Sequence, residues 1–127
     1  FLVKHLRIHW MEGEKHFKNC LVDYNQASNV AQWQWVAGCG ADAAPYFRIF
    51  NPILQGEKFD KEGLYVKKWV PEINKVPEKF THKPWEMELK YQQAIKIIIG
   101  KDYPKPIVIH EKARASALEA FQTLKKK

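Results

Sequence analysis

Residues 29–38, NVAQWQWVAG, are the most informative part of this sequence, because no charge falls among them while amides and indoles are crowded together. Buried amides need hydrogen-bond partners, and a helix that only filled a core would use Leu or Ile. A ligand with a mixed polar and aromatic surface would satisfy these groups, and small residues such as Ala31 and Gly38 would let something flat approach closely. On the residues alone, plain core packing of both tryptophans is an equal alternative.

Helical geometry divides this stretch into faces. Asn29 and Trp33 are four residues apart, so they share one face of a helix. Trp33 and Trp35 are two residues apart, about 200° around the axis, so their indoles point to nearly opposite sides. We therefore predict that if one indole meets a ligand, the other serves a different site or the core.

Outward from this stretch, the spacing of apolar residues predicts further helices. Residues 29–38 are predicted to form a short buried helix, capped by Ser28 or Asn29 and ended by Gly38. Gly13 is interpreted as a soft joint in the helix before it. The other predicted helices cover residues 1–10, 12–22, 61–70, 85–99 and 111–124.

The fold class follows from this pattern. Apart from residues 107–109, no alternating run of strand length occurs, so the predicted fold is all-α. The chain has 127 residues, no repeat and no visible linker, which predicts one domain over residues 1–127. The apolar opening Phe1-Leu2-Val3 has no cap before it, so we expect the chain to be the C-terminal part of something longer.

Composition limits the classes of protein to which this chain can belong. With 21 Lys and Arg against 14 Asp and Glu, the net charge of +7 fits an anionic partner, nucleic acid first, although many ordinary soluble proteins are equally basic. The uncharged residues 24–41 are too polar for a membrane span, and no leader marks the chain for export. Cys20 and Cys39 make no disulfide framework, so we expect structural thiols and a reducing, cytoplasmic compartment.

Three segments in order carry a family resemblance. Residues 33–60, WQWVAGCGADAAPYFRIFNPILQGEKFD, closely resemble the FAD-binding domain of the photolyase/cryptochrome family. YVKKWVPE (residues 65–72) and YPKPIVIHEKAR (residues 103–114) fall where that family has similar segments. Within the family, the WQW run resembles the class I cyclobutane pyrimidine dimer photolyases. The resemblance implies the C-terminal part of a helical FAD-binding domain, whose first part and N-terminal α/β antenna domain lie outside this chain.

The resemblance also implies an activity, that of a deoxyribodipyrimidine photo-lyase. In this family light excites reduced FAD, which donates an electron to a cyclobutane dimer flipped out of the DNA duplex; the ring splits and the electron returns. The implied partner is ultraviolet-damaged DNA, and we expect a monomer without a membrane partner. The implied cofactors are FAD and a folate or deazaflavin antenna chromophore in the N-terminal domain.

Four residues match the family's FAD site. Asp23, Tyr24 and Asn25 occupy its short FAD-contacting loop, and Asn25 stands where the family commonly has aspartate. The amide loses that negative charge, which favours the reduced, anionic flavin. Asn29 matches the asparagine that faces flavin N5 in photolyases, where plant cryptochromes commonly carry aspartate. Without the family, Asp23 is an ordinary turn residue and Asn29 a helix cap.

Aromatic residues match the family's electron-transfer and DNA sites. Trp33 matches the tryptophan next to the flavin, and Trp10 matches the middle relay of the photoreduction chain, with simple helix packing as the alternative for Trp10. Trp35 matches an indole that packs against the flipped dimer, and Gln55 matches a position assigned to DNA contact. Weaker candidates for phosphate neighbours are Arg48 and Lys58.

Three functions therefore compete: a light-driven DNA repair lyase, a cryptochrome-type blue-light photoreceptor that binds FAD without repair, and a helical nucleic-acid-binding domain without a cofactor. Asn29 and the WQW run favour repair. The five histidines are scattered and form no HExxH pattern, so no metal site is expected.

Overall fold

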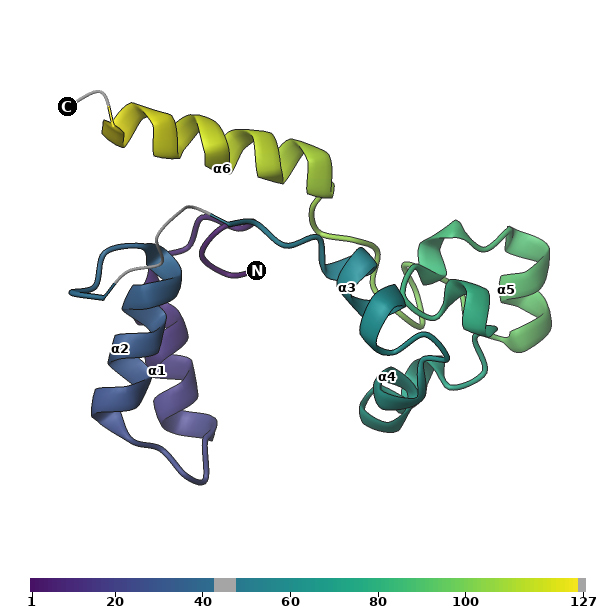
Figure 1. The fold of residues 1–127 in the computed structure, drawn as a ribbon. Helices are drawn as coiled ribbons and strands as arrows, with labels where there is room; N and C mark the ends of the chain where they lie inside the picture. Colours follow the sequence, from purple (N-terminus) through teal and green to yellow (C-terminus); the bar gives the residue numbers. More distant parts are fainter. Residues whose placement is uncertain (43–47, 126–127) are drawn as a thin grey trace. The chain divides into compact units, whose positions relative to one another are not determined.

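The computed structural model describes residues 1–42 and 48–125, and in these residues the backbone forms helices and turns with one isolated bridge, Ile99 to Tyr103, and no strand. The predicted all-α class is therefore confirmed. The chain divides into two compact units (Figure 1). The first unit comprises Phe1–Ile49 and Val108–Lys127, and the second unit comprises Phe50–Ile107. The assignment of the whole chain to one domain stays a prediction.

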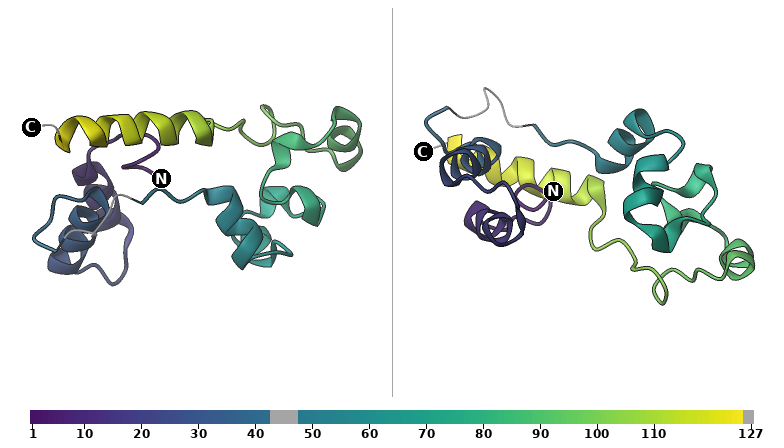
Figure 2. Two further views of the ribbon diagram at one scale, coloured as in Figure 1. Left: turned by 45° about the horizontal axis from the view of Figure 1, so that its top comes forward. Right: turned by 90° about the horizontal axis from the view of Figure 1, so that it is seen from below.

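In its described residues the first unit holds the helices α1 (Trp10–Cys20), α2 (Gln26–Ala37) and α6 (His110–Lys125). Helices α1 and α2 lie side by side as a helical hairpin (Figures 1 and 2). Side-chain hydrogen bonds join the segment before α1 to α6. His5 Nε2 lies 2.9 Å from His110 Nδ1, and Arg7 Nη1 donates to Ser116 Oγ at 3.1 Å.

The predicted helix over residues 1–10 is wrong. Residues 2–5 form turns, in which the N–H groups of His5 and Leu6 both donate to the Phe1 carbonyl. Arg7 has a left-handed backbone (φ 56°), which stops a right-handed helix from continuing. Helix α1 begins at Trp10 instead, where His9 Nδ1 accepts from Met11 N–H, and it runs without interruption through Gly13. The prediction that Gly13 is a soft joint is therefore wrong, because the helix is continuous there.

Helix α2 begins earlier than predicted. Asn25 is its N-cap, because Asn25 Oδ1 accepts from Ser28 N–H at 3.0 Å, so neither Ser28 nor Asn29 fills that role. The cap adds one turn to the predicted helix and places Asn29 inside it. The helix ends at Ala37, followed by Gly38 with a left-handed backbone (φ 75°), which is the predicted stop.

The second unit is a set of short helices around a small apolar core. Its helices are α3 (Pro52–Phe59), α4 (Leu64–Trp69) and α5 (Leu89–Ile95), with single 3-10 turns at Pro71–Ile73, Glu78–Phe80 and Pro84–Glu86. The core side chains are Ile73, Val76, Met87 and Ile97. Helix α5 is shorter than predicted at both ends. Residues Pro84–Glu86 form a separate 3-10 turn before it, and Lys96 ends it with a left-handed backbone (φ 58°).

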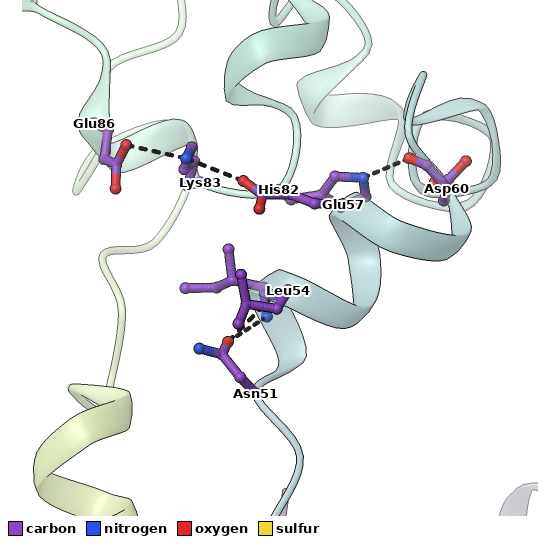
Figure 3. A network of polar contacts seen from close by, with 8 residues as sticks. Asn51, Leu54, Glu57, Asp60, His82, Lys83 and Glu86 are labelled. Carbon is purple, nitrogen blue, oxygen red and sulfur yellow. Dashed lines mark hydrogen bonds and ion pairs between the residues drawn. The ribbon is translucent and has the colours of Figure 1, made fainter.

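Helix α3 has no counterpart among the predicted helices. Asn51 begins it: its Oδ1 accepts from the N–H groups of Ile53 and Leu54 at 3.0 and 3.3 Å, and Pro52 sits in the first turn, where no N–H is needed (Figure 3). At the other end His82 Nε2 lies 2.6 Å from the Asp60 carbonyl. Gly56 makes room for the His82 ring, because a Cβ there would lie 2.5 Å from Nδ1.

Asp60 links α3 to α4. Its two carboxylate oxygens accept from the N–H groups of Tyr65 and Val66, both at 3.0 Å, so the carboxylate supplies the cap that Gly63 cannot. The hydrogen bond from Val66, helped by that from Tyr65, holds the pKa of Asp60 below its ordinary value. In the part of the chain described here, no helix is both long and apolar enough to cross a bilayer.

The Asp60 cap predicts an acid-sensitive start of α4. Because the folded pKa lies below the unfolded value of about 3.9, the cap contributes its full stability above that value and loses it as the pH falls through the folded pKa. We expect Asp60→Ala to speed amide exchange of Tyr65 and Val66 at neutral pH. The unaltered chain should lose the same protection only below about pH 4. Residue-resolved hydrogen exchange measures both.

The matched control for this prediction is Glu62→Ala, which removes an exposed carboxylate from the same turn. It should leave both amides protected. Equal protection in the Asp60→Ala and unaltered chains at neutral pH would contradict the prediction.

Candidate functional site

Trp33 lies against the backbone of α1. A Cβ on Gly13 would come within 2.2–2.5 Å of the outer atoms of the Trp33 ring, a distance that real contacts do not reach. Phe17, one turn further along α1, meets the same ring edge to face, with centroids 5.1 Å apart and planes at 74°. The indole is therefore fixed in a half-buried slot with Gly13 as its floor and Phe17 as its side.

Asn29 is the buried amide of α2, with 8% of its surface exposed, whereas Gln32 is exposed and Gln34 half-buried. Its Nδ2 donates to the Glu14 backbone carbonyl at 3.1 Å and to Glu14 Oε1 at 3.2 Å. Both of these oxygens only accept hydrogen bonds, so the nitrogen must face α1 and the amide oxygen must point away from Glu14. The orientation of Asn29 is thus set by Glu14.

A second residue, Tyr24, also donates a hydrogen bond to Glu14. The Tyr24 hydroxyl donates to Glu14 Oε1 at 2.9 Å, which ties the loop between α1 and α2 to the middle of α1. Burial, followed by the hydrogen bond to this carboxylate, raises the pKa of Tyr24, so the phenol keeps its proton and remains a donor. One carboxylate therefore positions both Tyr24 and Asn29, two of the residues that the family resemblance places at FAD.

The other two loop residues are placed differently. Asn25 is exposed, and its side-chain oxygen serves as the cap of α2. Asp23 is also exposed and precedes Tyr24 in the turn between the two helices. The structure thus joins Tyr24 and Asn29 through Glu14 but does not include Asp23 or Asn25 in that hydrogen-bonded group.

Trp10 and Trp35 are not members of the hydrogen-bonded group formed by Glu14, Tyr24 and Asn29. Trp10 is the first residue of α1 and is half-buried, with its ring 5.7 Å from that of His9. It lines an apolar groove of about 380 Å³ together with residues of the N-terminal segment, the end of α2 and α6. Trp35 keeps 42% of its surface exposed, so α2 turns its two indoles into different surroundings.

A shallow hollow of about 570 Å³ runs along a further face of α2. Its lining carries no charge and combines small side chains with two amides: Gln26, Ala27, Val30, Ala31 and Gln34. Asn29 and Trp33 are not part of the lining, because they point toward α1. The hollow is therefore uncharged, with the amides of Gln26 and Gln34 among small and apolar side chains.

The candidate DNA residues fall in both units. Trp35 and Arg48 belong to the first unit; Arg48 is exposed, and its carbonyl accepts from Lys4 Nζ at 2.5 Å. Gln55 is half-buried on α3 of the second unit. Lys58 is exposed on the same helix, with Nζ 5.0 Å from the centre of the Phe59 ring.

Glu14 and Gly13 are the residues that sequence reasoning missed. A glycine inside a helical pattern can signal close approach of another group, and Gly13 carried that signal. No local pattern marks Glu14, which meets Asn29 across fifteen residues of sequence. Cys20 and Cys39, expected to be structural thiols, are both free and exposed. In residues 1–42 and 48–125, no three His, Cys, Asp or Glu side chains gather as metal ligands would.

Comparison with known proteins decides the family. Residues 1–123 match the family described as the FAD binding domain of DNA photolyase. The chain belongs to this family. The resemblance drawn from the sequence is therefore confirmed.

Relatives place the chain within longer proteins. It is 56% identical to the deoxyribodipyrimidine photo-lyase of Agrobacterium fabrum strain C58 over 126 residues, which are 99% of this chain and 26% of the relative. A solved structure described as a bacterial class III photolyase from Agrobacterium tumefaciens superposes with a TM-score of 0.91 at 56% identity, over 100% of this chain and 26% of that one. The chain thus spans about a quarter of these relatives, and its own subclass stays a prediction.

A cryptochrome is also similar. The Synechocystis sp. PCC6803 cryptochrome structure gives a TM-score of 0.86 at 35% identity, over 94% of this chain and 24% of that one. The fold of this region is therefore shared by proteins described as photolyases and as a cryptochrome.

The contact between Trp33 and Gly13 predicts whether Gly13→Ala stabilises or destabilises the protein. Helix propensity alone would make Gly13→Ala stabilising by roughly 0.5–1 kcal/mol. The added Cβ collides with the Trp33 ring, and overpacking of this kind typically costs about 1–3 kcal/mol. We expect Gly13→Ala to lower the free energy of unfolding by about 1 kcal/mol or more. Denaturant unfolding followed by tryptophan fluorescence measures it.

Asn19→Ala is the control, because Asn19 is exposed on the same helix and nothing in the slot touches it. It should be neutral or slightly stabilising. A Gly13→Ala protein that is more stable than the unaltered one would show that Trp33 does not occupy the slot.

Proposed function

We propose that this chain forms one side of the FAD site in a light-driven enzyme that repairs cyclobutane pyrimidine dimers in DNA. The observation that carries the proposal is the arrangement of Asn29 and Trp33, one turn apart on α2 and both fixed by α1. The family match and the name of the Agrobacterium relative support it. The longer protein would also hold an antenna chromophore elsewhere.

The residues present fit a flavin ring. Asn29 is buried with its nitrogen engaged by Glu14, so its oxygen is the group available to an N–H donor. The surrounding stretch of α2 is free of charge, and small side chains line its hollow face. Under the proposal, Asn29 and Tyr24 hold the ring, and Asp23 and Asn25 border it. FAD, when bound, supplies the light-driven electron donation.

Trp33 has the properties of an electron relay to that site. Indole is among the easiest side chains to oxidise, and a relay must keep its ring in one position. Contact with Gly13 and Phe17 provides this for Trp33. Trp10, at the start of α1, is the proposed next relay.

Replacing Trp33 tests this route. Trp33→Phe in a full-length protein that contains this chain should abolish light-driven reduction of oxidised FAD, because phenyl is much harder to oxidise than indole. The change is followed as flavin absorbance under blue light. Trp69→Phe, at an exposed position of α4, is the matched control and should photoreduce normally. Unaltered photoreduction in Trp33→Phe would remove this residue from the route.

Trp35 has the properties of a lesion-contacting side chain. It is an exposed indole on the helix that carries Asn29, and base–aromatic stacking contributes about 1–3 kcal/mol per base. Gln55 is proposed as a second DNA contact, and the net charge of +7 favours a polyanion.

A cryptochrome-type photoreceptor is the second candidate function, favoured by the likeness to the Synechocystis protein. Asn29 argues for repair, since the resemblance places aspartate at this position in plant cryptochromes. Both candidates bind FAD, so flavin binding does not separate them. Repair of damaged DNA does.

A repair assay discriminates between the two. Full-length protein loaded with FAD, mixed with ultraviolet-irradiated DNA, should remove dimers under blue light and not in the dark. Trp35→Ala should weaken binding of dimer-containing DNA about 5- to 150-fold, as the loss of one stacked base predicts, while binding of undamaged DNA stays the same. A flavin-loaded protein that leaves all dimers in place would reject the repair proposal and support the photoreceptor.

A further inference from the structure

We propose that His5 and His110 form an acid-sensitive latch, which holds the segment before α1 against α6 while both rings are neutral and releases it when they take up protons. His5 Nε2 lies 2.9 Å from His110 Nδ1, and the two ring centres are 5.1 Å apart. Both residues belong to the first unit, so the latch is a tertiary contact within one compact body. It does not depend on the proposed function.

The surroundings of His5 make a charge on this ring costly. Only 8% of the residue's surface is exposed, and the Phe1 ring stacks on the imidazole with centres 5.1 Å apart. His5 Nδ1 is buried and has no hydrogen-bond partner among the described residues. A charged histidine carries hydrogens on both ring nitrogens, so a proton on His5 would bury an N–H that has no acceptor.

Counting the hydrogens on the two rings shows which states keep the latch closed. In the neutral pair, His5 Nε2 can donate its hydrogen to the lone pair of His110 Nδ1, and the buried His5 Nδ1 then keeps only a lone pair. The two facing nitrogens share a single hydrogen, so one added proton forces a hydrogen onto His5 Nδ1, whichever ring holds the charge. A second added proton puts hydrogens on both facing nitrogens, and the rings repel. Each proton therefore weakens the closed latch.

No anion compensates for such a charge. Besides His5, the ionisable groups of the segment all become positive when they are charged: Lys4, Arg7, His9 and the Phe1 amino group, which is an uncharged peptide nitrogen in any longer chain. The charged residues near the start of α6 are exposed: Glu111, Lys112 and Arg114. Among the described residues, no carboxylate forms an ion pair with either ring. Burial, followed by the charges of the Phe1 amino group and His110, lowers the pKa of His5.

Opening of the latch would change the surroundings of Trp10. Arg7 Nη1 also joins the segment to α6 through Ser116 Oγ, but that hydrogen bond is exposed and water can replace it. The left-handed backbone of Arg7 is unfavourable for a residue with a Cβ, so the contacts around the segment must hold it. Because the segment and α6 both line the apolar groove at Trp10, release of α6 would admit water to that indole.

Hydrogen exchange in a full-length protein that contains this chain tests the latch. Peptides covering residues 1–9 and 108–116 report its opening, once the intrinsic effect of pH on exchange is removed. Below about pH 6 the open state should bind at least one more proton than the closed state, so the opening constant should rise about tenfold or more for each pH unit. His5→Gln keeps a polar group near the position of Nε2 but cannot be charged, so its opening constant should not rise.

Two further variants complete the design. His16→Gln removes an exposed histidine of α1 outside the latch; it is the matched control and should show the same rise as the unaltered protein. His110→Asn removes the other ring while keeping an amide near the position of Nδ1, and should also abolish the rise. An opening constant in the unaltered protein that does not depend on pH, or an equal rise in His5→Gln, would overturn the proposal. So would an equal rise in peptides of the second unit, because it would indicate general unfolding by acid.

Discussion

The Trp33 indole lies on the backbone of α1 at Gly13, and the first unit is arranged around that contact. A side chain at position 13 would separate the two helices, so the absence of a Cβ sets their distance. Phe17 then closes the slot from the side. Because Asn29 stands one turn before Trp33, the approach that seats the indole also brings the amide against Glu14.

This proximity changes how the polar character of residues 29–38 is explained. Amides in an uncharged helix suggested a ligand that would satisfy them. The nitrogen of Asn29 is satisfied inside the protein by Glu14, and Gln32 is exposed to solvent. Burial of the amide is therefore not evidence of a ligand by itself. What bears on ligand binding is the direction in which Glu14 turns the amide oxygen.

Features set by neighbouring residues could be predicted from the sequence, whereas features set by contacts between distant residues could not. The stop of α2 at Gly38 was predictable, because one residue with a left-handed backbone determines it. Its start was not, since Asn25, Ser28 and Asn29 are all good caps and the packing of Asn29 against α1 selects the first. The helix predicted over residues 1–10 does not form, because a left-handed backbone at Arg7 interrupts it. The role of Glu14 depends on contacts ten and fifteen residues away, which no local pattern records.

The helical state of residues 33–35 is itself part of the proposed function. An electron relay needs a fixed, half-buried ring, and a lesion contact needs an open one. In a strand, residues two apart point to the same face, so both indoles would share one environment. In α2 the same spacing turns them about 200° apart. Trp33 thereby enters the slot at Gly13, while Trp35 keeps 42% of its surface exposed. A step of two residues along the helix, just over half a turn, thus gives two identical side chains the different environments that their proposed roles require.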